Sequence, residues 1–116
     1  MTEKEHNFCQ LQYTGWPEYG IPSSTSSIFL LIKAIRKMVE LNEKNVNILV
    51  HCSSGAGRSG TFIALYYLLE TLEQKMQDYK LLQNGEPTKA VNEEDINIDV
   101  FNTVFNVSKE RCEMVM

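Results

Sequence analysis

The 116-residue sequence lacks the features of secreted, membrane-spanning and nucleic-acid-binding proteins. Its N-terminal stretch, MTEKEHNF, is polar and acidic and has no apolar core, so we expect no signal peptide. Its longest apolar stretch, SSIFLLIKAI, is interrupted by Lys33 and is too short to cross a bilayer. The formal net charge of -4 argues against a nucleic-acid partner.

Cysteine and histidine are also scarce. The three cysteines are an odd number without the spacing of a disulfide framework, which favours free thiols in a reducing, cytoplasmic setting. With only two histidines, the chain shows no ligand spacing for a metal, and nothing in it implies a cofactor. A composition of 43% hydrophobic and 22% charged residues then predicts one soluble globular domain at most.

The hydrophobic pattern predicts an α/β domain. Residues 8–16 alternate apolar and polar side chains as a strand does, and the run NVNILV at 45–50 predicts a second strand. Between them, helical spacing predicts a helix over about 26–42, with a serine at 23, 24 or 26 as its N-cap. This order favours a right-handed parallel crossover, so we expect helices packed on a small, mainly parallel sheet.

Two further helices follow in the second half of the chain. The pattern predicts a long helix from Arg58 to about Met76 and a third helix over 98–112. The residues between them, 77–97, are polar and contain Asn84-Gly85 and Pro87, which predicts a loop.

The segment HCSSGAGRSG, residues 51–60, carries the strongest functional signal. A helix N-terminus has unsatisfied N–H groups and the positive end of the helix dipole. Feeding it from a strand through a glycine-bearing loop lets successive N–H groups converge on one anion, and Gly55 and Gly57 permit the backbone angles required. Arg58 adds a planar fork suited to two phosphate oxygens. The segment therefore predicts a phosphate-binding cradle.

Cys52 stands at the rim of this predicted cradle. A free thiol has a pKa of ~8.5, whereas helix N-termini and nearby cations lower it to ~3.5–7.5. The donors that hold phosphate would also stabilise a thiolate, and the hydroxyls of Ser59 and Thr61 could donate to the sulfur or the loop. That arrangement predicts a cysteine nucleophile for phosphoryl transfer.

Each of these residues also has an ordinary interpretation. A cysteine at a strand end is usually a small hydrophobe, and a lone His51 is more often a satisfied structural histidine than a catalyst. The Cys-x5-Arg spacing alone is weak. The combination of spacing, glycines, preceding strand and following helix favours the anion site.

HCSSGAGRSGTF resembles the signature loop of the protein-tyrosine phosphatases. QYTGWPEYGIP resembles the mobile Trp-Pro-Asp loop that carries the general acid of that family, and residues 99–115 resemble its following helix. The Trp-Pro loop and GRSGTF favour the tyrosine-specific group over the dual-specificity phosphatases. By this resemblance, residues 1–116 form a partial catalytic domain with an acid-bearing loop at 15–22, a signature loop at 51–60 and a loop insertion at 77–95.

The resemblance also implies roles for single residues. Cys52 would be the nucleophile, Arg58 would clamp the phosphoryl oxygens, and Glu18 would be the acid that protonates the leaving phenolate. Ser59 would help the thiolate leave in the second step, and His51 would help lower the pKa of Cys52. Backbone N–H groups would complete the phosphate cradle, from Ser53, Ser54, Gly55, Ala56, Gly57 and Arg58.

The chain departs from the family pattern in two ways. Active members carry Asp where this chain has Glu18, and glutamate there resembles the second domains of receptor-type phosphatases, many of which are weakly active or inactive. The resemblance also covers only the C-terminal half of a catalytic domain, so we expect a truncated sheet with an unpaired edge, exposed apolar surface and poor solubility.

Three functions are compatible with these residues. The first is a tyrosine phosphatase that acts on a phosphotyrosine-containing protein through a cysteinyl-phosphate intermediate. The second is a pseudophosphatase that binds phosphotyrosine or a companion phosphatase domain of a longer parent protein, which could be a membrane receptor. The third, a redox-sensing thiol, follows from a low pKa at Cys52 and is compatible with either.

Overall fold

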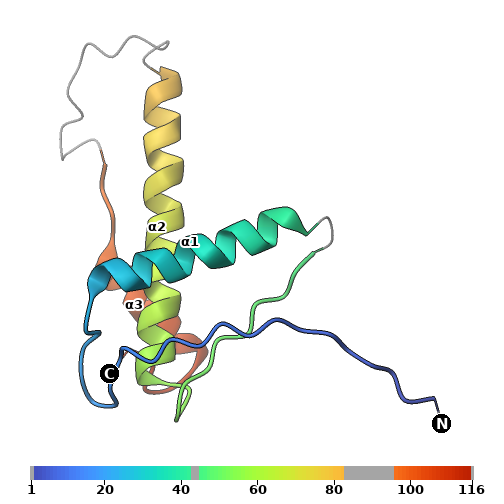
Figure 1. Ribbon diagram of the computed structural model, residues 1–116. Helices are drawn as coiled ribbons and strands as arrows, with labels where there is room; N and C mark the ends of the chain where they lie inside the picture. The colour runs from blue at the N-terminus through green and yellow to red at the C-terminus, as the bar shows by residue number, and fades with distance from the viewer. Residues whose placement is uncertain (1, 43–44, 83–95, 116) are drawn as a thin grey trace. The chain divides into compact units, whose positions relative to one another are not determined.

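The computed structural model describes residues 2–42, 45–82 and 96–115. The chain divides into two compact units, residues 1–47 and 48–116. Three helices are present in the described ranges, and Figure 1 labels them. Helix α1 spans Thr25–Leu41 in the first unit, while α2 (Gly57–Leu82) and α3 (Val100–Glu110) belong to the second.

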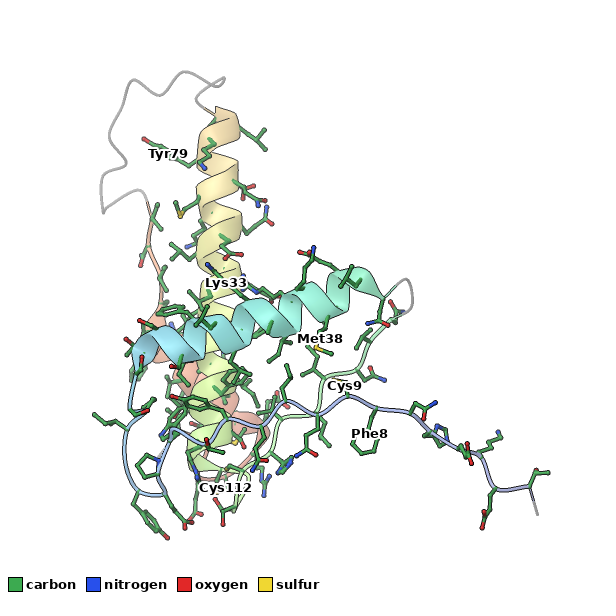
Figure 2. The ribbon with its side chains drawn as sticks, viewed as in Figure 1. Phe8, Cys9, Lys33, Met38, Tyr79 and Cys112 are labelled. Carbon is green, nitrogen blue, oxygen red and sulfur yellow. The ribbon has the colours of Figure 1, made fainter. Side chains whose placement is uncertain are left out.

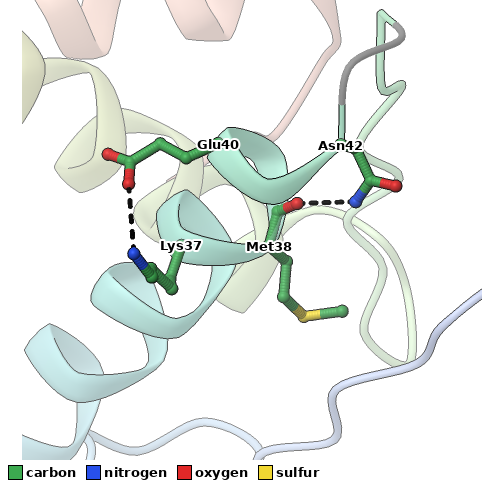
Figure 3. A network of polar contacts seen from close by, with 4 residues as sticks. All are labelled: Lys37, Met38, Glu40 and Asn42. Carbon is green, nitrogen blue, oxygen red and sulfur yellow. Dashed lines mark hydrogen bonds and ion pairs between the residues drawn. The ribbon is translucent and has the colours of Figure 1, made fainter.

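Helix α1 begins and ends close to the predicted positions. Ser24 is the N-cap, and its hydroxyl accepts a hydrogen bond from the backbone N–H of Ser27 at 3.4 Å. At the other end Asn42 caps the helix, with its side-chain amide donating to the carbonyl of Met38 at 2.6 Å (Figure 3). The i, i+4 pair Ile28 and Ile32 forms the buried stripe of the helix, as amphipathic spacing requires.

The loop at residues 15–22 is closed by local hydrogen bonds. The N–H of Gly20 donates to the carbonyl of Pro17 at 3.3 Å, which makes a four-residue turn. The indole N–H of Trp16 donates to the carbonyl of Gly20 at 3.0 Å and closes the turn from its other side. Tyr19, at the third turn position, has a φ of 56°, a left-handed conformation that costs energy for a tyrosine. The loop is therefore built as an ordered turn with Glu18 at its tip.

Helix α2 is longer than the sequence pattern predicts. It continues to Leu82, so the prediction that a loop starts at residue 77 is wrong. The side-chain amide of Gln74 donates to Asp78 at 3.0 Å, an i, i+4 bond across the expected boundary, and Tyr79 lies on the added turns (Figure 2). The rest of the predicted insertion, residues 83–95, lies outside the described residues.

Helix α3 packs against α2 within the second unit. Asp99 is its N-cap and accepts the backbone N–H of Asn102 at 2.9 Å, which lowers the pKa of the Asp99 carboxyl. Lys75 of α2 donates to the carbonyl of Asn97 just before this cap. The third helix is thus two residues shorter at each end than the predicted 98–112.

The two predicted strands form no ladder within the described residues. Residues 8–16 and 45–50 are irregular there, and Ile48 and Leu49 of the second segment are exposed. A β-strand is stable only beside a hydrogen-bonded neighbouring strand, and neither segment has one within the described residues. The parallel sheet therefore stays a prediction. None of the described helices is both long enough and apolar enough to cross a membrane.

Candidate active site

The loop at 51–56 leads directly into the first turn of α2. The carbonyl of Ala56 accepts the N–H of Gly60 at 2.8 Å, so Ala56 stands where the helix begins. Ala56 and Ser59 are buried, whereas Cys52 is only partly buried. The segment is therefore anchored at the helix end, and the N–H groups of its first turn have no partner within the helix.

The thiol of Cys52 is the most perturbed group of this loop. Partial burial raises its pKa, but hydrogen bonds outweigh that effect and lower the pKa to about 6. The donors are the hydroxyl of Ser59 and the backbone N–H groups of Ser59, Gly55 and Ala56. Because all of them stabilise the negatively charged sulfur, Cys52 is mostly thiolate at neutral pH.

Ser59 is one of the residues that lower the pKa of the Cys52 thiol. Its side chain is 3% exposed, and its hydroxyl makes no hydrogen bond of ordinary geometry in the described part of the chain. The hydroxyl nevertheless contributes to the lowered pKa of Cys52, because it favours the negatively charged sulfur. The hydroxyl of Thr61 has a backbone partner instead of the sulfur. It donates to the carbonyl of Gly57 at 3.0 Å, within the first turn of α2.

Gly55 is favoured by its backbone conformation, and a side chain at this position would also displace Arg111. Its φ of +68° lies in the left-handed region, which side chains other than glycine rarely adopt. A Cβ at this position would also lie 2.8 Å from Nη1 of Arg111. The second effect follows from a contact that the sequence does not reveal.

Arg111, just after α3, reaches back to this loop. Its Nη1 donates to the carbonyl of Gly55 at 2.9 Å, and its Nη2 donates to the carbonyl of Ser54 at 3.1 Å. The hydrophobic pattern predicts only that position 111 falls near the end of a helix over 98–112. No local pattern marks a partner more than fifty positions away.

The remaining predicted residues fall into two groups. Arg58 is the partly buried second residue of α2, and exposed His51 directly precedes Cys52. The structure thus brings the predicted residues 51–59 together in one loop and helix turn. Glu18 lies at its turn in the first unit, so its role as the acid stays a prediction.

The whole chain matches the family model described as Protein-tyrosine phosphatase, over residues 1–116. Receptor-type tyrosine-protein phosphatase V of Rattus norvegicus is 34% identical over 113 residues, 97% of this chain and 5% of that protein. Receptor-type tyrosine-protein phosphatase alpha of Homo sapiens is 37% identical over 112 residues, 97% of this chain and 11% of that protein. The chain therefore spans roughly a tenth or less of the length of these relatives.

A solved structure of a protein tyrosine phosphatase is also similar to this chain. The crystal structure of a protein tyrosine phosphatase from Trypanosoma brucei aligns with 90% of this chain and 29% of its own, with a TM-score of 0.56 and 28% sequence identity. This likeness supports a fold of the same kind as part of that enzyme.

Proposed function

The chain belongs to the protein-tyrosine phosphatase family, and we propose that the loop around Cys52 carries out phosphoryl transfer from phosphotyrosine. The observation that carries this proposal is the thiol of Cys52, whose pKa is lowered to about 6 by donors of its own loop. A thiolate at neutral pH is the reactive form of a cysteine nucleophile.

The proposed reaction has two steps. In the first, the Cys52 sulfur attacks phosphorus, an S–P bond forms, and the P–O bond to the aryl group breaks with its electron pair on the phenolate oxygen. Glu18 gives its proton to that oxygen, because a phenol has a pKa of ~10 and leaves poorly as the anion. In the second step, water attacks phosphorus and gives a proton to the Glu18 carboxylate, the S–P bond breaks, and inorganic phosphate leaves.

The loop and helix residues stabilise the charges of both steps. The N–H groups of residues 53–58 and the guanidinium of Arg58 would bind the phosphoryl oxygens. Ser59 donates to the sulfur, which stabilises the thiolate both as attacking and as leaving group. His51, directly before the nucleophile, is proposed to favour the same charged form.

A non-catalytic function has one observation in its favour. The acid position holds Glu18, whose carboxyl stands one methylene farther from the backbone than that of an aspartate. A misplacement of ~1 Å can cost roughly 100-fold in rate. The alternative is a module that binds phosphotyrosine or a companion phosphatase domain without turning over.

The first step can be tested without depending on the acid. A dinitrophenyl phosphate has a leaving group that needs no proton, so it should phosphorylate Cys52 whatever Glu18 does. We expect a burst of phenol and a phosphoryl group on the peptide that contains Cys52, detected by mass spectrometry after acid quench. Cys52→Ser is the matched control.

Two outcomes would contradict the proposal. One is phenol release that persists in Cys52→Ser. The other is binding of a phosphotyrosine peptide with no phosphoryl group on any residue, which would support the non-catalytic alternative.

The relatives also suggest a cellular setting. The two relatives described above are receptor-type phosphatases by name. We propose that this chain acts on phosphotyrosine-containing proteins in the cytoplasm, as part of a longer protein with a companion phosphatase domain.

A further inference from the structure

We propose that Arg111 is a positioning residue, which holds two peptide groups of the loop so that their N–H bonds point at the sulfur of Cys52. The proposal rests on the proposed function, because it concerns the same nucleophile. It adds a residue from the end of α3 to a site that is otherwise built from residues 51–59.

The geometry of the peptide bond carries the argument. In a trans peptide the carbonyl and the following N–H belong to one rigid plane and point in opposite directions, and the described backbone has no cis bond. The carbonyl of Ser54 shares its plane with the N–H of Gly55. The carbonyl of Gly55 shares its plane with the N–H of Ala56.

Arg111 therefore binds the carbonyl ends of the two peptide groups whose N–H ends donate to the sulfur of Cys52. Its guanidinium accepts no hydrogen bond and donates to the carbonyls of Ser54 and Gly55, at 3.1 and 2.9 Å. The N–H groups of Gly55 and Ala56, on the far side of the same planes, are two of the backbone donors to the sulfur. Fixing the carbonyl ends fixes the direction of the N–H ends.

The guanidinium also strengthens these donors. A peptide group whose carbonyl accepts a charge-assisted hydrogen bond is polarised, so that its N–H becomes a better donor. The rigid fork of arginine can hold two neighbouring carbonyls at once, whereas a lysine ammonium is a single point charge on a flexible stem. Both effects favour the thiolate over the thiol.

The turn after α3 aims the Arg111 side chain. The hydroxyl of Ser108 shares its proton between the carbonyl of Val104 at 2.9 Å and the carbonyl of Met114 at 3.2 Å, which brings the chain after the helix back to its last turns. Val115 takes a φ of 65°, strained for a β-branched residue. The segment lies so close to α2 that a Cβ on Gly60 would be 2.6 Å from the backbone nitrogen of Val115. The turn is thus fixed against the first turn of α2, near the loop that Arg111 holds.

A purely structural tether would make the same contacts, so the test must read the thiol itself. We would measure the rate of iodoacetamide alkylation of Cys52 against pH, peptide by peptide, in the full chain and in Arg111→Met and Arg111→Lys. We expect the midpoint to rise by about one pH unit or more in Arg111→Met. Arg111→Lys should fall between this variant and the unsubstituted chain.

Lys109→Met is the matched control, because it removes the same charge one residue from the end of α3 without touching the loop. Helix content from circular dichroism shows whether each variant is folded, and Arg111→Lys keeps the test decisive if Arg111→Met unfolds. An unchanged midpoint in a folded Arg111 variant would overturn the proposal. An equal shift in Lys109→Met would do the same, because it would reveal a general effect of charge.

The titration needs no turnover, so its result is separate from that of the phosphorylation experiment. A raised midpoint in Arg111→Met without phosphoryl transfer would support the positioning role and contradict the proposed function. A midpoint near 9 in the unsubstituted chain would overturn the positioning role directly.

Discussion

At the scale of single residues, the proposed acid Glu18 would determine how well the reaction works with a poor leaving group. Its turn is closed by the hydrogen bonds of Trp16 and Gly20. If the extra methylene of glutamate misplaces the carboxyl relative to the leaving oxygen, Glu18→Asp should raise kcat/KM for phenyl phosphate by up to about 100-fold. The same substitution should change kcat/KM for dinitrophenyl phosphate by no more than about twofold, because that leaving group needs no proton.

The ratio of the two kcat/KM values is the measurement that checks this prediction. Glu3→Asp makes the same chemical change at an exposed position of the same unit and should leave both values unaltered. An equal effect of Glu18→Asp on both substrates would show that Glu18 is not the acid.

Some residues of the site could be predicted from the sequence, and others could not. The spacing of Cys52 and the following glycines predicted a thiol with a lowered pKa, and the structure confirms this because the donors are local. Ser59 was predictable as a hydroxyl donor for the same reason. Arg111 was not, since a contact across more than fifty positions depends on how α3 packs and on the turn that follows it.

At the scale of elements, Gly60 ties the end of α3 to the beginning of α2. Alanine inside a helix is normally more favourable than glycine by roughly 1 kcal/mol. Here its Cβ would lie 2.6 Å from the backbone nitrogen of Val115, so the turn that carries Arg111 must move. We expect Gly60→Ala to lower the thermal midpoint and to raise the pKa of Cys52 through Arg111.

Thermal melting and the Cys52 alkylation profile together check this prediction. Gln77→Ala places alanine at an exposed position of the same helix and should change neither quantity. A Gly60→Ala variant that is more stable than the unsubstituted chain would show that the segment around Val115 does not pack against α2 as described.

The elements themselves were predicted unevenly. Helix α1 lies within one residue of its predicted bounds at each end, because a serine cap and amphipathic spacing are strong local signals. Helix α2 extends beyond its predicted end because residues 77–97 are polar as a whole, and an i, i+4 bond such as that from Gln74 to Asp78 leaves no mark in a hydrophobic pattern. The strands depend on hydrogen-bonded neighbours, which a hydrophobic pattern alone cannot supply.

At the scale of the whole molecule, much apolar surface is exposed for so small a chain. Buried apolar side chains in the described ranges are few: Ile28, Ile32, Ala56, Phe62 and Ala64. On α3, Phe101 and Phe105 stack with ring centroids 6.2 Å apart, yet they are 77% and 48% exposed. The described residues therefore bury only a few apolar side chains and leave many others exposed.

Folding and the charge of Cys52 are thermodynamically linked. The pKa of Cys52 is about 6 in the folded chain, against an ordinary value of 9.0. The thiolate therefore stabilises the folded state fully above pH 9, and this contribution is lost as pH falls toward 6. Between these values the free energy of unfolding should rise with pH, by at most about 1.4 kcal/mol per unit because one proton is involved.

The most direct test of the account is the pH profile of Cys52 alkylation with and without denaturant. Cys9 and Cys112 are exposed and free, so they serve as references in the same sample (Figure 2). We expect Cys52 to titrate near pH 6 in the folded chain and near 9.0 in denaturant. Cys52 titrating together with Cys9 and Cys112 under both conditions would contradict it.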